Sequence, residues 1–259
     1  MKTKMKSVLI AGVAGLAATT MFAQSSTTQE IVNYSVKVVM SNTGADPDTT
    51  GASGTVQATE ATTDTTKRNT DKETLNVTAK GLDPLTDYTV SAVQSESNTP
   101  VGSATTDKKG NLKASFSTNT KGKKNLGPPP TPLTSVTEVD VVNSNSVTVL
   151  VADMNGPTSL KYTVRKDVAD SDSGAVAALT VSSNTKHAMF GLSASALNPG
   201  EGYFLLFNGK VVQTNNASGK GTLKFLNPLV STNVVTPFVL QTVEVAQTNG
   251  TPAFSTTIP

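Results

Sequence analysis

Two short acidic segments, GADPDTTGA and DVADSDSGA, hold the residues best suited to chemistry, and each follows a strand-like stretch that begins at a tyrosine. Clustered carboxylates and carbonyls at a turn suit Ca²⁺, which takes roughly six to eight oxygen ligands in irregular geometry. The spacing is not that of an EF-hand loop, which also ends in a glutamate. The alternative is that Asp, Ser, Pro and Gly stand here because turns favour them. The candidate ligands are Asp46 and Asp48 in the first segment, and Asp170 and Asp172 in the second.

Most other chemistry is missing from the sequence. The chain has no cysteine, which excludes disulfides, thiol nucleophiles, cysteine metal ligands and a lipid-modified cysteine. His187 is the only histidine, and the nearest approach to a G-x-S-x-G elbow, GLSAS, fails at its last position. We expect His187 to lie at the surface or at a strand edge. The sequence therefore predicts a protein that is not an enzyme and has no cofactor other than calcium. A hydrolase with two carboxylates is the catalytic class left open.

The elements that position these residues come from an internal repeat. The pattern Leu-x-Pro-x-x-x-Tyr occurs twice and ends at Tyr88 and at Tyr203. Tyr34 and Tyr162 each begin a four-residue segment of the form Tyr-x-Val followed by Lys or Arg. The pattern Gly-x-Leu-Lys also occurs twice, once after Tyr88 and once after Tyr203. Landmarks in the same order indicate a duplicated unit.

The repeat also sets the expected domain boundaries. We expect domain 1 over residues 31–153 and domain 2, its duplicate, over 158–259. The proline run GPPP at 127–130 resembles a linker, but its counterpart lies inside the second copy, so we place it within domain 1. Residues 59–74 (TEATTDTTKRNTDKET) are polar and charged, which predicts a long mobile loop.

Strand signals recur at short intervals in both copies. Alternating apolar and polar residues rich in Val and Thr predict about seven strands in each. Turn residues at 107–111 and 215–219 predict a hairpin in each copy, and residues 251–259 should form a final strand. The sequence therefore predicts an all-β protein with two tandem antiparallel β-sandwich domains of Greek-key type.

The segment GLDPLTDYTVSAV (81–93) resembles the tyrosine corner of fibronectin type III and immunoglobulin-like domains. The resemblance implies an immunoglobulin-like sandwich in which the hydroxyls of Tyr88 and Tyr203 bond to the backbone near Leu82 and Leu197. This makes both tyrosines structural. The alternative is that the tyrosines stack against a ligand.

The N-terminus predicts export. Residues 1–23 join three lysines, a short apolar run and a small-residue cleavage point after Ala23, as in a bacterial secretory signal peptide, and residues 24–30 would be an extension. An uncleaved anchor is the alternative, although the apolar run is short for a span. Without those three lysines, the 21 basic residues fall to 18, against 19 acidic residues. This balance gives no basic footprint for nucleic acid, and no later stretch is apolar enough to cross a membrane.

Export, tandem sandwiches and missing catalytic groups predict a secreted structural or adhesive protein of the cell envelope or extracellular matrix. Its partners would be a cell-surface or matrix component, or further copies of itself, for instance through pairing of the final strand with a neighbouring sheet edge. The alternative is an extracellular ligand-binding module for a protein or polysaccharide, with calcium as a possible requirement. The absence of tryptophan disfavours a sugar site more than a protein partner.

Overall fold

The structure, a computed structural model, describes residues 30–65, 68–119, 125–167, 175–184, 188–226 and 242–258. Over these residues the protein is all-β, its strands pair antiparallel throughout, and no helix is long and apolar enough to cross a membrane. The elements of the first half are β1 (Glu30–Asn42), η1 (Pro47–Thr49), β2 (Ser53–Thr65), β3 (Arg68–Lys80), β4 (Asp87–Gln94), β5 (Ser97–Thr105), β6 (Leu112–Ser117), η2 (Leu133–Ser135), β7 (Val136–Val142) and β8 (Thr148–Asp153). Those of the second half are β9 (Ser159–Asp167), β10 (Val176–Asn184), β11 (Ala188–Ser195), β12 (Gly202–Phe207), β13 (Lys210–Asn216), β14 (Leu223–Leu226), β15 (Thr242–Gln247) and β16 (Pro252–Thr257).

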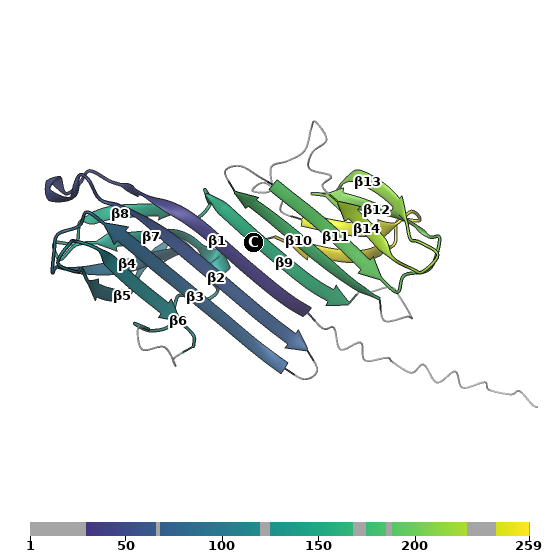
Figure 1. The fold of residues 1–259 in the computed structure, drawn as a ribbon, viewed down its shortest axis with the longest axis horizontal. Helices are drawn as coiled ribbons and strands as arrows, with labels where there is room; N and C mark the ends of the chain where they lie inside the picture. Colours follow the sequence, from purple (N-terminus) through teal and green to yellow (C-terminus); the bar gives the residue numbers. More distant parts are fainter. Residues whose placement is uncertain are drawn as a thin grey trace, which may run out of the picture.

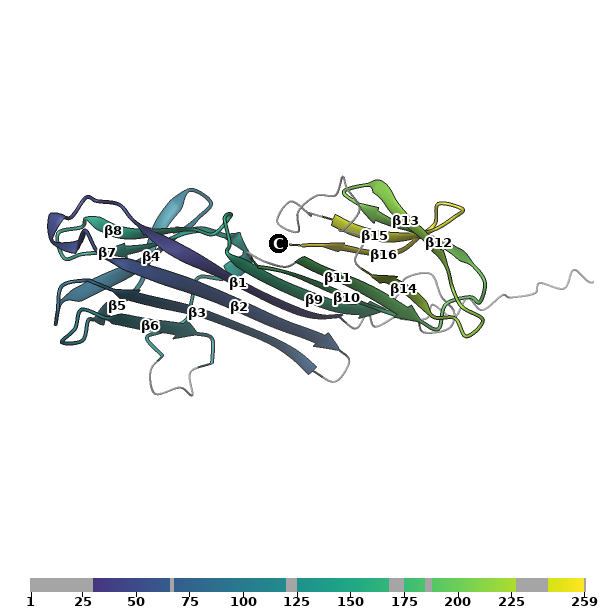
Figure 2. The same ribbon diagram turned by 45° about the horizontal axis from the view of Figure 1, so that its top comes forward.

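The two halves of the chain make the same strand pairings. In the first half β1-β2-β3-β6 lie side by side, and so do β5-β4-β7-β8. In the second half the matching orders are β9-β10-β11-β14 and β13-β12-β15-β16. Figure 2 shows the first group of each half in one layer and the second group in a layer behind it. Each half is therefore two stacked sheets, which is the arrangement of a β-sandwich.

The front layer runs without interruption through both halves because β1 pairs with β9 (Figure 1). Its order is β6-β3-β2-β1-β9-β10-β11-β14. Tyr34 stands directly opposite Tyr162, and the flanking pairs are Val32 with Val164 and Val36 with Leu160. The pairing is therefore symmetric about the two tyrosines: the residue two before Tyr34 pairs with the residue two after Tyr162, and the reverse also holds. Two identical strands related by a two-fold axis would pair in the same way.

β1 also closes one side of the first half. After pairing with β2 and β9 it crosses to the back layer, where Ser41 and Asn42 pair with β8. The Thr43 amide then donates to the Val149 carbonyl at 3.0 Å. β1 thus belongs to both layers and joins β8 to the front sheet.

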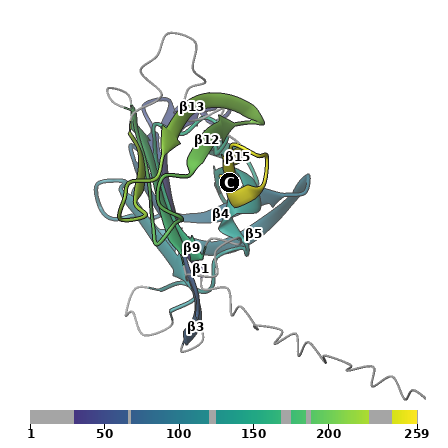
Figure 3. The same cartoon turned by 90° about the vertical axis from the view of Figure 1, so that its right-hand side faces the viewer.

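The core lies between the layers, which Figure 3 shows end-on. Alternate side chains of β1, from Tyr34 to Met40, are buried, and the residues between them face outward. The largest fully buried side chains come from both halves, among them Phe116 and Phe225 on the equivalent strands β6 and β14. Burial of one face of each strand by the opposing sheet is the main source of stability of such a fold.

Two expectations from the sequence were wrong. β5 and β6 do not pair as a hairpin across residues 107–111, because β5 pairs with β4 in the back layer and β6 with β3 in the front layer. The turn crosses between layers, and so does its counterpart at 217–222. Residues 59–65 and 68–74 are the facing ends of β2 and β3, two 13-residue strands, where the sequence predicted a loop. Their threonines favour extended backbone, and they are polar on both faces because they reach the margin of the apolar core.

Several other expectations agree with the structure or lie outside it. The predicted final strand is confirmed as β16, which pairs with β15. The proline run lies between β6 and η2, within the first half, as predicted. Residues 1–23, His187 and residues 168–174 of the second acidic segment lie outside the described residues.

Candidate functional site

Asp46, one of the predicted calcium ligands, caps a turn. It is the N-cap residue of η1, where its Oδ1 accepts from the Asp48 amide at 3.1 Å. Its Oδ2 accepts from the Asn143 side chain at 2.8 Å. Both carboxylate oxygens therefore have protein donors, while the Asp48 side chain points to an exposed surface. Asp170 and Asp172 lie outside the described residues, so the second loop stays a prediction.

The hydroxyl of Tyr88 pins the corner between β3 and β4. It accepts a hydrogen bond from the Asp83 amide at 3.1 Å and donates to the Asp83 carboxylate at 3.3 Å, one residue beyond the expected Leu82. Tyr88 is fully buried, and Tyr203 is buried at the equivalent start of β12. In immunoglobulin-like domains this corner precedes strand F, whereas here it precedes the fourth of eight strands. The motif thus marks a crossing between the layers.

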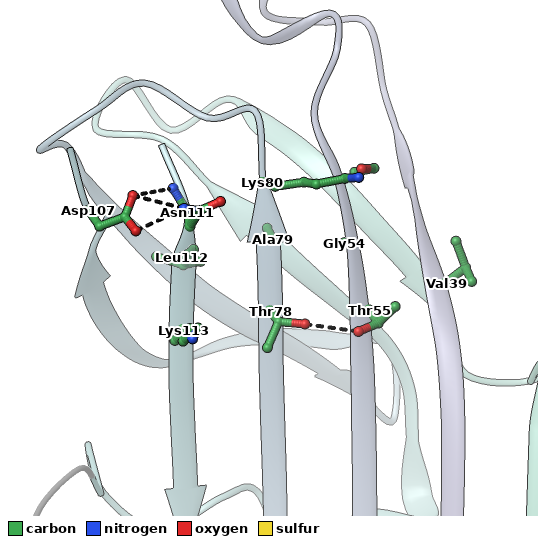
Figure 4. Close-up of a pocket in the computed structure, with 11 residues that line it drawn as sticks. Val39, Gly54, Thr55, Thr78, Ala79, Lys80, Asp107, Asn111, Leu112 and Lys113 are labelled. Carbon is green, nitrogen blue, oxygen red and sulfur yellow. Dashed lines mark hydrogen bonds between the residues drawn. The ribbon is translucent and has the colours of Figure 1, made fainter. Parts of the chain in front are cut away.

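The outer face of the front layer carries a shallow hollow over β1, β2, β3 and β6. Its volume is about 610 Å³, within the range of small-ligand sites. Figure 4 shows Thr55 and Thr78 pointing toward one another across β2 and β3, with their hydroxyls 2.9 Å apart. Val39 stands at one side, and Lys80 and Lys113 bring positive charge. The hollow therefore offers hydroxyls, cations and one exposed apolar side chain.

Polar side chains continue along this outer face. Ser115 donates to the Asn76 side chain at 2.7 Å, and the hydroxyls of Thr74 and Ser117 lie 3.2 Å apart. Each pair spans β3 and β6 at successive outward positions. Such ladders hold the side chains in place and leave hydrogen-bonding groups in solvent.

A group of acidic side chains on the inner face was not predicted from the sequence. Within the described part of the chain, Glu60, Asp71 and Glu73 are the set whose carboxylate oxygens lie close enough to hold one metal ion, all within 4.8 Å of one another. Glu60 stands opposite Glu73 in the pairing of β2 with β3, and Tyr34 stands opposite Glu60 in the pairing of β1 with β2. These residues lie in the stretch that the sequence predicted to be a loop, and only the pairing of β2 with β3 brings them together.

Burial and mutual repulsion disturb the titration of this group. Burial first, and then the Asp71 charge, raise the pKa of Glu60. Burial likewise raises the pKa of Glu73, with smaller contributions from Asp71 and Glu60, while a hydrogen bond from the Leu133 amide lowers it. Burial and the nearby Glu60 raise the pKa of Tyr34 to about 12, so its hydroxyl stays neutral. The region concentrates negative charge at the edge of the core.

No model of a known protein family matches this chain, and no curated protein is significantly similar to it.

Proposed function

We propose that this chain is an exported, non-enzymatic structural or adhesive protein of the cell envelope or extracellular matrix. In this proposal a cleaved signal peptide directs it outward, and two tandem immunoglobulin-like sandwich units, related by duplication, form the mature protein. The observation that carries it is the pairing of β1 with β9, which joins the front sheets of both halves. A junction made by a ladder of backbone hydrogen bonds resists bending better than a linker does. A stiff body with a broad outer face suits a load-bearing or adhesive protein.

The outer face of the front layer also supports this proposal. Its ordered hydroxyl and amide ladders and its lysines can hydrogen-bond to a polar matrix. Contacts of this kind are individually weak, so adhesion requires many of them at once, which a continuous sheet provides. The proposed partner is a cell-surface or matrix component.

The test is co-sedimentation of purified residues 24–259 with envelopes of the producing cells, with calcium and then with chelator. Pelleting supports the proposal, and recovery of all the protein in the supernatant under both conditions contradicts it. Thr78→Arg would place a bulky charge in the hollow, and Thr180→Arg, at an exposed position on β10, is the matched control. If the first variant alone stays in the supernatant, the contact surface lies over β2 and β3.

The hollow also favours a second candidate function, an extracellular ligand-binding module. A volume of about 610 Å³ with two lysines and paired threonines fits a small polar ligand. This alternative predicts no pelleting, together with saturable binding of a soluble glycan or peptide that Thr78→Arg abolishes. Binding that survives Thr78→Arg would contradict it.

A further inference from the structure

Three carboxylates meet where β2 and β3 extend to the edge of the core. Glu60 lies on β2, Asp71 and Glu73 lie on β3 two residues apart, and all three share the inner face. One oxygen from each lies within 4.8 Å of the others. Calcium binds oxygen at about 2.3–2.6 Å, so two of its ligands are at most about 5 Å apart. The separation of these oxygens therefore matches a single ion held among them.

Two of the oxygens are buried without a hydrogen-bond partner. The Glu73 side chain is 1% exposed, and its Oε1 accepts from the Leu133 amide at 3.1 Å. Its Oε2, like Oε2 of Glu60, is buried and has no hydrogen-bond donor among the described residues. An ionised carboxylate that loses water without gaining a donor or a cation is strongly destabilised. These two oxygens thus point to a missing ligand. Their lack of a hydrogen-bond partner is a separate observation from the short distances among the three carboxylates.

Among the side chains that the structure describes, the charges that perturb the group have one sign. The charged side chains that perturb the two glutamates are acidic: Asp71 acts on both, and Glu60 also acts on Glu73. No ion pair joins these residues to a Lys or Arg whose side chain the structure describes. Two arrangements would relieve the repulsion: protons on the carboxyl groups, or a bound cation. One proton shared between Glu60 and Glu73 would satisfy their two orphaned oxygens but leave two of the three negative charges in place, whereas a divalent cation contacts all three carboxylates and neutralises most of their charge.

The surrounding structure fixes the group and leaves one side open. η2 covers it, because the Leu133 backbone amide bonds to Glu73 and a Thr134 backbone hydrogen bond reaches Glu60. The Glu73 amide donates to the Thr118 hydroxyl at 3.0 Å. Asp71 is exposed, and it accepts from the Thr62 hydroxyl at 3.3 Å. An ion entering on the Asp71 side could keep water in its remaining coordination positions.

We propose that Glu60, Asp71 and Glu73 bind one divalent cation of the calcium class at the junction of β2, β3 and η2. The ion joins the extended hairpin of β2 and β3 to the loop that covers the core. This site is separate from the two acidic loops that the sequence singled out, and it goes beyond the structural function proposed above and does not depend on it.

Terbium luminescence on the purified chain tests this proposal. Tb³⁺ occupies calcium sites and emits when a nearby tyrosine transfers excitation energy to it. The chain has no tryptophan, and Tyr34 is the cross-strand neighbour of Glu60. We expect saturable emission that Ca²⁺ displaces, and a higher unfolding temperature in Ca²⁺ than in chelator. Tyr34→Phe should weaken the emission and leave the calcium-dependent rise in unfolding temperature in place.

Ligand variants then locate the ion. Glu60→Gln and Glu73→Gln should each weaken Ca²⁺ binding at least tenfold and remove the calcium-dependent rise in unfolding temperature. Asp71→Asn, at an exposed ligand, should weaken binding without affecting the fold, and circular dichroism checks each variant. The double variant Asp46→Asn with Asp48→Asn is the matched control and should bind as the parent does. The proposal is overturned if calcium leaves the parent unchanged, or if only the control variant loses binding.

Discussion

Gly110 lies directly against the backbone of Leu82, where the turn between β5 and β6 meets the corner between β3 and β4. The Leu82 amide donates to the Gly110 carbonyl at 3.1 Å, and a Cβ on Gly110 would overlap the Leu82 carbonyl oxygen. The second half repeats this contact with Leu197 and Gly221, whose hydrogen bond is 3.0 Å long. Both glycines have positive φ. This contact holds together the two places where the chain crosses between layers, which explains why the turn does not close a hairpin.

Gly110→Ala should therefore destabilise the protein by more than about 2 kcal/mol, since the left-handed backbone alone costs an alanine roughly 1–2 kcal/mol and the overlap adds to it. Gly44→Ala is the matched control, because Gly44 has a similar φ of 69° and nothing within 4 Å of an added Cβ. Urea unfolding of both variants separates the cost of the left-handed backbone, which both variants share, from the cost of the overlap with Leu82, which only Gly110→Ala has. Equal losses would show that the contact with Leu82 contributes nothing.

Tyr88→Phe should cost about 1–2 kcal/mol, because the variant removes the acceptor of the Asp83 amide and keeps the buried ring. The fold should survive, with unchanged circular dichroism and a lower midpoint in urea. A loss below about 0.5 kcal/mol would mean that water replaces the hydroxyl without cost, and would contradict the role of this hydrogen bond in fixing the corner.

The junction of the two halves can be tested by cross-linking, because the chain has no native cysteine. Ser35 and Lys161 are direct cross-strand partners on the outer face of β1 and β9. The double variant Ser35→Cys with Lys161→Cys should form a disulfide on mild oxidation, since directly paired Cα atoms lie within the range that a disulfide spans. Free-thiol titration under denaturing conditions measures this.

The control for cross-linking moves one cysteine along β9. Thr163 pairs with Asn33 and is diagonal to Ser35. Ser35→Cys with Thr163→Cys should keep its thiols free under the same oxidation, because diagonal neighbours lie about 7–8 Å apart. Equal yields from both pairs would contradict the register.

Two carboxylates should give stability opposite dependences on pH. Burial, and then the neighbouring Glu138, raise the pKa of Asp140, so its folded state holds the proton more tightly than the unfolded chain does. Asp140 therefore destabilises the folded state progressively as the pH rises from the usual aspartate pKa through the raised pKa of the folded state. Asp140→Asn should raise the unfolding temperature at neutral pH and have little effect at about pH 3.

Asp107 supplies the contrast. Hydrogen bonds from the Asn111 side chain and backbone, and then from the Lys109 amide, lower its pKa. The ionised Asp107 side chain therefore stabilises the folded state at pH values above the usual aspartate pKa. This stabilisation is lost as the pH falls through the lowered pKa of the folded state. Asp107→Asn should therefore lower the unfolding temperature at neutral pH, with a difference that shrinks on acidification. Parallel profiles for the two variants would contradict this assignment.

Local pattern predicted much of the fold and failed where partners are distant in sequence. The alternation at Tyr34, Val36 and Val38 identified a strand with one buried face, and the structure agrees. Nothing near Tyr34 indicates that Tyr162 is its neighbour, because side-chain alternation specifies the face that a strand buries and leaves its partner open. The same holds for the turn at Gly110, whose residue types suit a hairpin and a crossing between layers equally well.

The acidic group was hidden for a related reason. Glu60 and Glu73 stand 13 residues apart in a polar stretch that lacks apolar alternation, so composition favoured a loop. Pairing of β2 with β3 places them side by side, and η2, much later in the chain, covers them. The threonines of this stretch prefer strands, which is a local signal for the pairing of β2 with β3. The hydrogen bond from the Leu133 amide is a tertiary contact, for which the local sequence holds no signal.

The symmetry of the β1 and β9 pairing has a consequence for solubility. A single eight-stranded unit would leave β1 as a long open edge, and open edges recruit other chains into aggregates. In this protein β9 pairs with that edge, and Tyr34 stands opposite Tyr162, its counterpart in the other half. Two copies of β1 that paired through their equivalent tyrosines would have the same register. Each half thus covers the open edge that the other would expose at this position, and because both belong to one polypeptide, dilution does not separate them.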